Sequence, residues 1–345
     1  MKHDVPPGLM RKEQSVFVAL LLVTLCLARF LGESALSLYV LFALTAMVTV
    51  GVSLLMGQAG QVSLGQGAFY ACGAYTAGVL TTHGCPGAVA LLVAPVAAAA
   101  LAAVIGVPLL LLRGHHLAFA TLATHLIALS VIGEMTITGG DVGLQGIPRL
   151  RLGPLELDSV RSYAYLSSLA LAAVVLVARN ILASRPGRAL RALSSSELAA
   201  ASSAIPVGRY KLAVFSLSAA FAGLAGGIYA FYMGYLAPGS FPVLLSVEYV
   251  VMATIGGLGT IPGGVLGAAV VLLLVHALSR LATASGMPST APVILSYAVY
   301  AVLLITAVLF LPGGIVSAIA MARTRIARHR PTRGATDAST TGPSR

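Results

Sequence analysis

The amino-acid sequence predicts an all-α fold, a polytopic transmembrane helical bundle of about ten spans, some of them broken or re-entrant. Of the 345 residues, 58% are hydrophobic and only 9% are charged, whereas a soluble domain carries about 25% charged residues. The apolar residues lie in continuous runs, and a transmembrane β-barrel would instead show alternating segments of about 10 residues. Lipid-facing runs of this kind are helical because a helix satisfies its backbone hydrogen bonds within one segment.

A transmembrane helix needs about 20 mostly apolar residues, and ten stretches of the chain are candidates. The third, eighth and ninth are the weakest because they are short or rich in glycine. The predicted spans are residues 15–32, 36–56, 67–81, 87–112, 117–133, 163–183, 212–235, 243–259, 263–282 and 292–311. The first follows a short charged segment and leads into further spans, so we interpret it as a transmembrane helix and not as a cleaved signal peptide.

Basic residues indicate how the helices are oriented. The net charge is +11, and the bases gather in loops and tails, which the positive-inside rule explains without nucleic acid as a partner. The basic clusters are Lys2, Arg11 and Lys12; Arg113 with His115 and His116; the 184–211 loop; and Arg323, Arg325, Arg328, Arg330 and Arg333. They fall before the first span and after the fourth, sixth and tenth, which predicts ten spans with both termini in the cytoplasm.

The predicted domain organisation is one transmembrane domain, residues 15–316, between a cytoplasmic segment at 1–14 and a basic cytoplasmic tail at 317–345. The tail is poor in apolar residues, so we expect it to be disordered and to attract anionic membrane lipids. The outside loop at 134–162 has mixed charge and many glycine and proline turn signals, which predict a structured cap or a binding loop.

The 184–211 loop is the segment around which we interpret the rest of the chain. It is basic and helix-forming, and it lies between two apolar runs. Its charge excludes it from the hydrocarbon core and predicts a cytoplasmic location. There it is available to a soluble partner.

Two glycine-rich segments are candidates for the translocation pathway or its gate. Residues 57–75 read GQAGQVSLGQGAFYACGAY, and this pattern fits a cavity lining with uncharged hydrogen-bonding groups as well as it fits tight helix packing. Residues 255–268 read IGGLGTIPGGVLGA, where Pro262 after Gly259 predicts a break between two short helices, a feature typical of transport pathways. The pathway and gate candidates are Gln58, Gln61, Ser63, Gln66, Glu248, Gly256, Gly257 and Gly259.

Motifs of enzyme chemistry and metal binding are absent. The chain has no GxxxxGK[ST] loop with which to bind ATP, and no HExxH, CxxC or GxSxG arrangement. No pair of its cysteines, Cys26, Cys72 and Cys85, has metal-ligand spacing, so we interpret them as small packing residues.

An ion-coupled secondary transporter is the alternative function. Such a carrier needs buried acidic residues in its spans, and none form a series here. We interpret His125 and His276 as residues that hydrogen-bond a neighbouring helix in preference to a proton relay. A non-transporting scaffold, the third possibility, would not need paired glycine-rich broken helices.

Five motifs in family order resemble those of the membrane permease subunits of branched-chain (hydrophobic) amino-acid ABC importers. They are GQAGQVSLGQGAFYACGAY at 57–75, TGGDVGLQGIP at 138–148, the block from GRALRAL at 187 to GGIYAF at 231, SVEYVVMATIGGLGTIPGGVLGA at 246–268 and LPGGI at 311–315. The resemblance covers most of residues 36–316 and is closest to the longer of the family's two permeases.

The resemblance implies a permease subunit of an ATP-driven importer in the cytoplasmic membrane of a prokaryote. Its implied partners are a second permease, usually in a heterodimer, two ATP-binding cassette subunits that use ATP and Mg, and an extracytoplasmic substrate-binding protein. This chain would bind no cofactor and would not itself be an enzyme. The expected substrate is a branched-chain or other hydrophobic amino acid, although relatives carry urea, short amides and other small solutes.

The resemblance also implies that the 184–211 loop docks on the ATPase subunits. The family's E-A-A pattern falls within this loop, and we expect a short amphipathic coupling helix at 188–205. The coupling candidates are Arg188, Arg191, Glu197, Ala199, Ala200, Ala201 and Ala204. The chain departs from the family's pattern at Ala204, where glycine is usual, at Ser194–Ser196, where charged residues are common, and near His125 and Leu126, where an acidic residue is common.

Overall fold

The computed structural model describes residues 32–112, 114–153 and 155–284, together with residues 298, 302 and 315. Apart from those positions, the first and tenth predicted spans lie outside the described residues, as do segments 1–14 and 317–345. Seven helical stretches of the described part are long and apolar enough to cross a membrane, one of them Pro238–Gly256. The helix at Gln66–Thr82 is shorter, with 17 residues. The other eight predicted spans each coincide with a helix, so the predicted all-α transmembrane bundle is confirmed.

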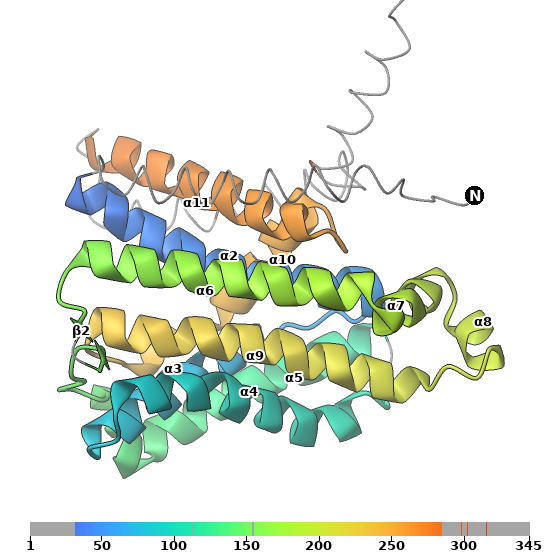
Figure 1. Cartoon of the computed structure of the whole chain (residues 1–345), viewed down its shortest axis with the longest axis horizontal. Helices are drawn as coiled ribbons and strands as arrows, with labels where there is room; N and C mark the ends of the chain where they lie inside the picture. Colours follow the sequence, from blue (N-terminus) through green and yellow to red (C-terminus); the bar gives the residue numbers. More distant parts are fainter. Residues whose placement is uncertain are drawn as a thin grey trace, which may run out of the picture.

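The described residues form a bundle of parallel and antiparallel helices, with two short helices that project from one end (Figure 1). The bundle helices are α2 (Glu33–Ala59), α3 (Gln66–Thr82), α4 (Gly87–Leu109), α5 (His115–Glu134), α6 (Val160–Ala183), α9 (Val207–Met233), α10 (Val243–Gly256) and α11 (Ile261–Ala284). The projecting helices are α7 (Arg185–Ser195) and α8 (Glu197–Ser202). Short 3-10 turns are η1 (Thr136–Thr138), η2 (Gly140–Val142) and η3 (Pro238–Ser240), and a small hairpin pairs β1 (Arg151–Leu152) with β2 (Leu155–Glu156).

The helix α9 is the centre of the bundle, because α2, α3 and α4 all pack along it. Glycines bring the backbones of α3 and α9 together. A Cβ atom on Gly226 would lie 2.0 Å from the carbonyl oxygen of Tyr70, and one on Gly73 would lie 2.1 Å from that of Gly223. Membrane helices associate through close packing of this kind, since lipid gives them no hydrophobic drive to associate. α3 and α9 are therefore in direct backbone contact.

The predicted break between the eighth and ninth spans is present, although α10 ends at Gly256, before the predicted end at residue 259. The cause is backbone conformation: Gly257 and Gly259 have φ values of 121° and 76°, which residues with a side chain rarely adopt. Pro262 lies in the first turn of α11, where its missing N–H is not needed. With 14 residues, α10 is about 21 Å long, shorter than the ~30 Å hydrocarbon core.

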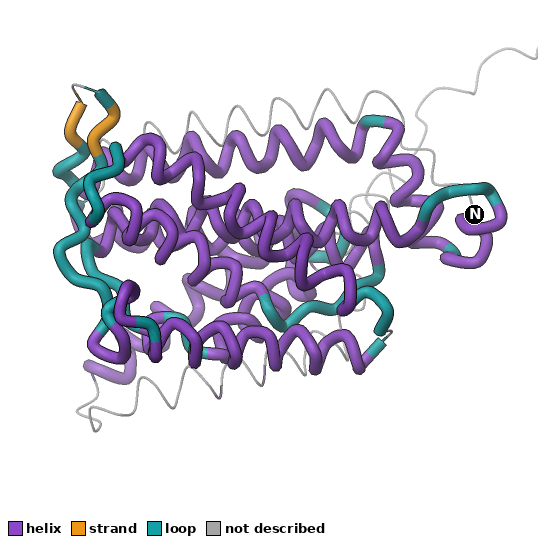
Figure 2. The backbone as a smooth tube through the Cα atoms, turned by 90° about the horizontal axis from the view of Figure 1, so that it is seen from below, coloured by secondary structure: helices purple, strands orange, loops and turns teal. Residues whose placement is uncertain are grey.

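The predicted outside loop at 134–162 forms a structured cap on the end of the bundle opposite α7 and α8 (Figure 2). Leu144 exchanges two backbone hydrogen bonds with Leu236 (2.7 and 3.0 Å), which tie the cap to the segment after α9. Arg151 pairs with Glu156 across the hairpin (2.8 Å), and this hydrogen bond raises the pKa of Arg151.

Candidate functional site

The first candidate site is the α7–α8 segment (residues 185–202), which stands beyond the end of the bundle (Figure 1). α7 is amphipathic and buries Leu190 and Leu193, in contact with α2, α6 and α9. The Arg191 guanidinium donates a hydrogen bond to the carbonyl oxygen of Leu182 in α6 (2.8 Å). Both basic coupling candidates, Arg188 and Arg191, are exposed, and Arg191 holds the segment to the bundle through this bond.

The α7–α8 segment contains two helices, so the prediction of one coupling helix at 188–205 is wrong. Ser196 interrupts it with an extended backbone (φ −163°, ψ 118°). The Ser196 hydroxyl accepts a hydrogen bond from the backbone N–H of Ala199 (3.3 Å) and so begins α8. Serine is favoured at the N-cap of a helix because its side chain accepts a hydrogen bond from a backbone N–H that has no partner within the helix.

The E-A-A residues of α8 divide between two surfaces. Glu197 forms an ion pair with Lys211 of α9 (2.8 Å), and Ala200 is buried in the core of the molecule. Ala199 and Ala201 are exposed. Glu197 and Ala200 therefore position α8, and the other two alanines lie on the surface that a partner could reach.

Leu198 is the residue of this site that the sequence analysis did not single out. Its side chain is 86% exposed, the highest value among the large hydrophobic side chains of the described residues. Exposed leucines on the bundle itself meet lipid, but Leu198 lies on the projecting segment, in a serine-rich and basic stretch. An isolated apolar residue directly after the glutamate of the E-A-A pattern is the sequence signal that could have identified it.

Ala204 ends α8 in the left-handed conformation, with φ 58°. The N–H of Ile205 donates to the carbonyl oxygen of Ala200 (3.2 Å), and the N–H of Ala204 donates to that of Ala201 (3.1 Å). These are the two hydrogen bonds of a Schellman motif, in which glycine usually occupies this position. The departure from the family's usual glycine therefore leaves a strained alanine in an otherwise regular helix end.

Ala204→Gly is expected to stabilise the end of α8 by about 1 kcal/mol, because the left-handed conformation costs a residue with a side chain roughly 1–2 kcal/mol. Hydrogen exchange should show about fivefold stronger protection at the amides of residues 204 and 205. Ala201→Gly is the matched control: it lies inside α8, where glycine costs about 1 kcal/mol, so protection should fall. Weaker protection in both variants would contradict the strain at Ala204.

The second candidate site lies where α2 ends against the turn between α10 and α11. The side-chain amide of Gln58 donates a hydrogen bond to the carbonyl oxygen of Gly259 (3.0 Å), and the N–H of Gly259 donates to that of Ser53 (2.9 Å). A Cβ atom on Gly57 would lie 2.0 Å from the Gly259 nitrogen. The structure therefore brings together Gln58 and Gly259, two gate candidates from distant segments.

Two further gate candidates, Gly256 and Gly257, are buried at the end of α10. A Cβ atom on Gly256 would lie 1.8 Å from the carbonyl oxygen of Gly263 in α11. The two helices thus touch through their backbones, and Gly256 has a packing role. The hydroxyl of Ser53 donates a hydrogen bond to the carbonyl oxygen of Thr260 (3.1 Å), so α2 also holds this turn in place.

A cluster that we call the polar junction joins α3, α5 and α10 and consists of Gly67, His125 and Ser246. The Ser246 hydroxyl accepts a hydrogen bond from the N–H of Gly67 (2.9 Å) and pairs with Nδ1 of His125 (3.0 Å). All three residues are buried, and a Cβ atom on Gly67 would lie 2.3 Å from Cε1 of His125. The predicted hydrogen bond of His125 to a neighbouring helix is confirmed, with Ser246 as a partner that the sequence had not indicated.

The remaining candidates lie in the link between α2 and α3, at the first residue of α3, and on α10. Gln61, Ser63 and Gln66 are buried, and Ser63 accepts a hydrogen bond from the N–H of Gly65 (3.4 Å). Among the described residues, neither amide atom of Gln66 has a hydrogen-bond partner. Buried groups of this kind are usually satisfied by ordered water or a ligand. Glu248 is half-buried and lies on α10, far along the chain from the residues between α2 and α3.

A bundle of membrane-length apolar helices defines an integral membrane protein, and the glycine break between α10 and α11 is a feature typical of transport proteins. The chain belongs to the family of permease components of branched-chain amino acid transport systems, whose family model matches residues 34–308. Members of this family are subunits of transporters. The family resemblance that the five motifs predicted is confirmed.

Two proteins are similar to this chain over most of its length. Both are named high-affinity branched-chain amino acid transport system permease protein LivM, one from Escherichia coli (strain K12) and one from Salmonella typhimurium (strain LT2). Each is 30% identical to this chain over 294 residues, which cover 78% of this chain and 69% of the relative. No solved structure matches the chain.

Proposed function

We propose that this chain is the permease subunit of an ATP-driven importer of branched-chain or other hydrophobic amino acids. The names of the two relatives support this substrate class. In the proposed assembly, a second permease completes the pore, two ATP-binding cassette subunits hydrolyse ATP with Mg, and an extracytoplasmic binding protein delivers the substrate. The chain itself binds no cofactor, and it lies in the cytoplasmic membrane of a prokaryote with the α7–α8 segment inside and the cap outside.

The observation that carries this proposal is the exposed apolar side chain on the α7–α8 segment. The bases of the 184–211 loop favour a cytoplasmic location, where Leu198, 86% exposed, would be surrounded by water. Burial of a leucine side chain contributes roughly 1.5–3 kcal/mol, and a few such anchors carry most of the energy of a protein interface. We assign Leu198 as the anchor that enters a groove on the ATPase subunit.

Movement of α8 would reach the bundle through residues that hold it. The ion pair of Glu197 with Lys211 connects α8 to α9, and α9 is in backbone contact with α3. The first turn of α3 carries Gly67 of the polar junction. Closure of the ATPase subunits would therefore shift α9 and α3 and favour either the closed or the open form of the polar junction. It can do so only if the ATPase subunits bind the two forms of the permease with different affinities.

Uptake by proteoliposomes tests the proposed function. With the complete complex and the loaded binding protein, labelled leucine should accumulate only when ATP is supplied to the ATPase side. Leucine uptake by this chain alone, driven by an ion gradient without ATP, would instead support the ion-coupled secondary transporter. Uptake of urea or a short amide in place of leucine would overturn the proposed substrate class.

Glu197→Arg is expected to uncouple ATP hydrolysis from transport, because the new guanidinium faces Lys211 and displaces α8 from α9. The bundle should still fold, because Glu197 lies on the projecting helix α8 and its side chain is 48% exposed. We expect leucine uptake by the reconstituted complex to fall about tenfold or more while ATP hydrolysis continues. The double variant Glu197→Arg with Lys211→Glu restores the pair and should recover much of the uptake. Wild-type uptake and stimulated ATPase activity in the single variant would contradict the role of this segment.

A further inference from the structure

The helix α6 connects the cap to the α7–α8 segment. Among the bundle helices of the described residues, only α6 contains neither glycine nor proline, the two residues that most weaken or kink a helix. Its 24 residues extend about 36 Å, more than the ~30 Å hydrocarbon core, and it packs along α2. α6 can therefore carry a displacement from one end of the bundle to the other.

The end of α6 next to α7 is held by close contact between the two helices. A single residue, Ser184, separates them. A Cβ atom on Gly187 would lie 2.2 Å from the carbonyl oxygen of Leu182, and the Arg191 guanidinium donates a hydrogen bond to the same oxygen (2.8 Å). α7 cannot rotate about Ser184 without breaking this contact, so α7 moves together with α6.

The other end of α6 is fixed to the cap by the hydroxyl of Tyr163, the fourth residue of the helix. This hydroxyl accepts a hydrogen bond from the N–H of Leu150 (3.3 Å) and donates one to the carbonyl oxygen of Phe231 in α9 (3.0 Å). Tyr163 is 2% exposed and Leu150 is fully buried. The carbonyl oxygen of Leu150 accepts from the N–H of Leu157 (2.9 Å) at the base of the hairpin. One buried hydroxyl thus joins the cap, α6 and α9.

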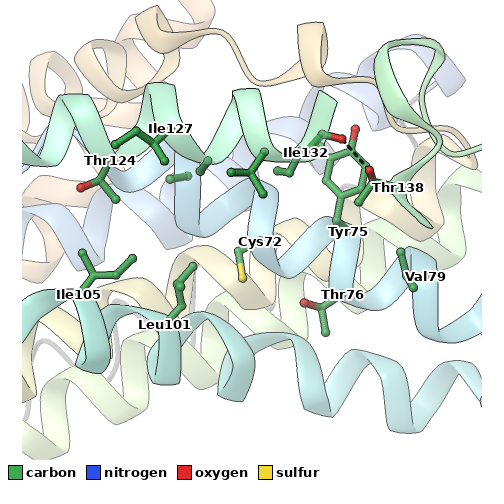
Figure 3. Close-up of a pocket in the computed structure, with 13 residues that line it drawn as sticks. Cys72, Tyr75, Thr76, Val79, Leu101, Ile105, Thr124, Ile127, Ile132 and Thr138 are labelled. Atoms are coloured by element: carbon green, nitrogen blue, oxygen red, sulfur yellow. Dashed lines mark hydrogen bonds between the residues drawn. The ribbon is translucent and has the colours of Figure 1, made fainter. Parts of the chain in front are cut away.

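The helix α5 also leads into the cap, but it is packed less closely than α6. An apolar groove of about 620 Å³ lies between α5 and the neighbouring helices α3 and α4 (Figure 3). α6 lines no part of this groove, and the chain passes from α6 almost directly into α7. Of the two helices that flank the cap, α6 is therefore the one that connects it to the α7–α8 segment.

We propose that α6 transmits the docking of the binding protein from the cap to the α7–α8 segment, and that Tyr163 is the positioning residue that fixes the cap to this helix. The inference rests on the proposed function and adds how the loaded binding protein stimulates ATP hydrolysis. Coupling between two binding sites is reciprocal. Nucleotide bound to the ATPase subunits therefore changes the affinity of the complex for the binding protein by the same factor.

The outer surface of the cap fits a protein partner that approaches through water, because its charged side chains are exposed. They are Asp141, Arg149, Arg151, Glu156 and Asp158. The cap has a second attachment, the hydrogen bonds between Leu144 and Leu236, but these reach only the segment after α9. Without the Tyr163 hydroxyl, the cap would be joined to α6 through the chain alone.

Tyr163→Phe tests the inference in the complete, reconstituted complex. The change removes only the hydroxyl, and the ring keeps its contact with Tyr232 (ring centroids 5.5 Å apart). We expect basal ATP hydrolysis to be unchanged, whereas its stimulation by leucine-loaded binding protein should fall about fivefold or more. The effect of a non-hydrolysable ATP analogue on the affinity for the binding protein should fall by the same factor.

Tyr165→Phe is the matched control, because it removes the same atom from the same helix at a position that is 37% exposed. Both the stimulation and the nucleotide effect should match the wild type in this variant. Arg191→Gln breaks the hydrogen bond at the other end of α6 from an exposed position. It should also lower the nucleotide effect on the affinity for the binding protein, and it decides the test if Tyr163→Phe does not assemble.

Wild-type coupling in Tyr163→Phe overturns the inference, as does an equal loss in Tyr165→Phe. If Tyr163→Phe does not assemble, a wild-type nucleotide effect in Arg191→Gln overturns it. A wild-type complex that imports leucine without stimulation of its ATP hydrolysis by the binding protein overturns it as well. A wild-type complex that imports no leucine overturns the proposed function instead.

Discussion

Leu198→Ala is expected to weaken the binding of the ATPase subunits about 30-fold, since truncation of an interface anchor costs about 2 kcal/mol or more. The chain itself should fold normally, because Leu198 is 86% exposed and changes at exposed sites usually alter stability by about 0.5 kcal/mol or less. The effect should therefore appear in assembly alone. Titration of purified permease with ATPase subunits, by surface plasmon resonance in detergent, measures it directly, and leucine uptake should fall in parallel.

The matched control for this prediction is Leu92→Ala. Leu92 is 71% exposed and lies on α4, far along the chain from the α7–α8 segment, so the same truncation should leave ATPase affinity unchanged. If both variants bind the ATPase subunits as tightly as the wild type, Leu198 is not an anchor. The docking role would then have to lie with other exposed residues of α8, such as Ala199 and Ala201.

Gly226→Ala should be strongly destabilising for a change of a single methyl group, with a cost of about 3 kcal/mol or more. The added Cβ atom would lie 2.0 Å from the carbonyl oxygen of Tyr70 and 2.9 Å from the nitrogen of Ala74. Both atoms belong to the backbone of α3, so no side chain can rotate away, and α3 must separate from α9. The apparent melting temperature of the purified protein and its yield as a monodisperse species should both fall.

Gly208→Ala makes the same change in the same helix and is the control. A Cβ atom on Gly208 would meet nothing within 4 Å, and alanine is favoured over glycine in a helix by about 1 kcal/mol. The melting temperature of this variant should therefore be unchanged or slightly higher. Equal behaviour of the two variants would show that backbone contact between α3 and α9 does not determine the stability of the bundle.

The transmembrane architecture could be predicted from the sequence because it depends on local properties, namely the length and polarity of each apolar run. The predicted end of α10 was three residues too late, and the reason is also local. The positive φ of Gly257 ends the helix inside a run that is still apolar. The break in the α7–α8 segment was also open to prediction, since Ser196 stands three residues before the N–H that it caps.

The contacts of the candidate sites could not be predicted in the same way. Gln58 and Gly259 are 201 positions apart, and His125 and Ser246 are 121 positions apart. Such pairings depend on the rotation and depth of each helix, which hydropathy does not determine. The exposure of Leu198 depends on where α8 begins, because a shift of one residue turns a helical side chain by about 100°.

In the proposed transport cycle, the absence of charged groups from the polar junction keeps the free energy of opening it low. Its hydrogen bonds, together with the bond from the N–H of Leu64 to Thr121 (2.9 Å), join uncharged groups, and interhelical hydrogen bonds in membranes contribute on average about 0.6 kcal/mol each. Opening all three would thus cost roughly 2 kcal/mol, whereas an ion pair at the same depth would have to separate two charges in lipid. Hydrogen bonds of this strength can break when α3 is displaced by a small amount. They can form again by thermal motion once α3 returns.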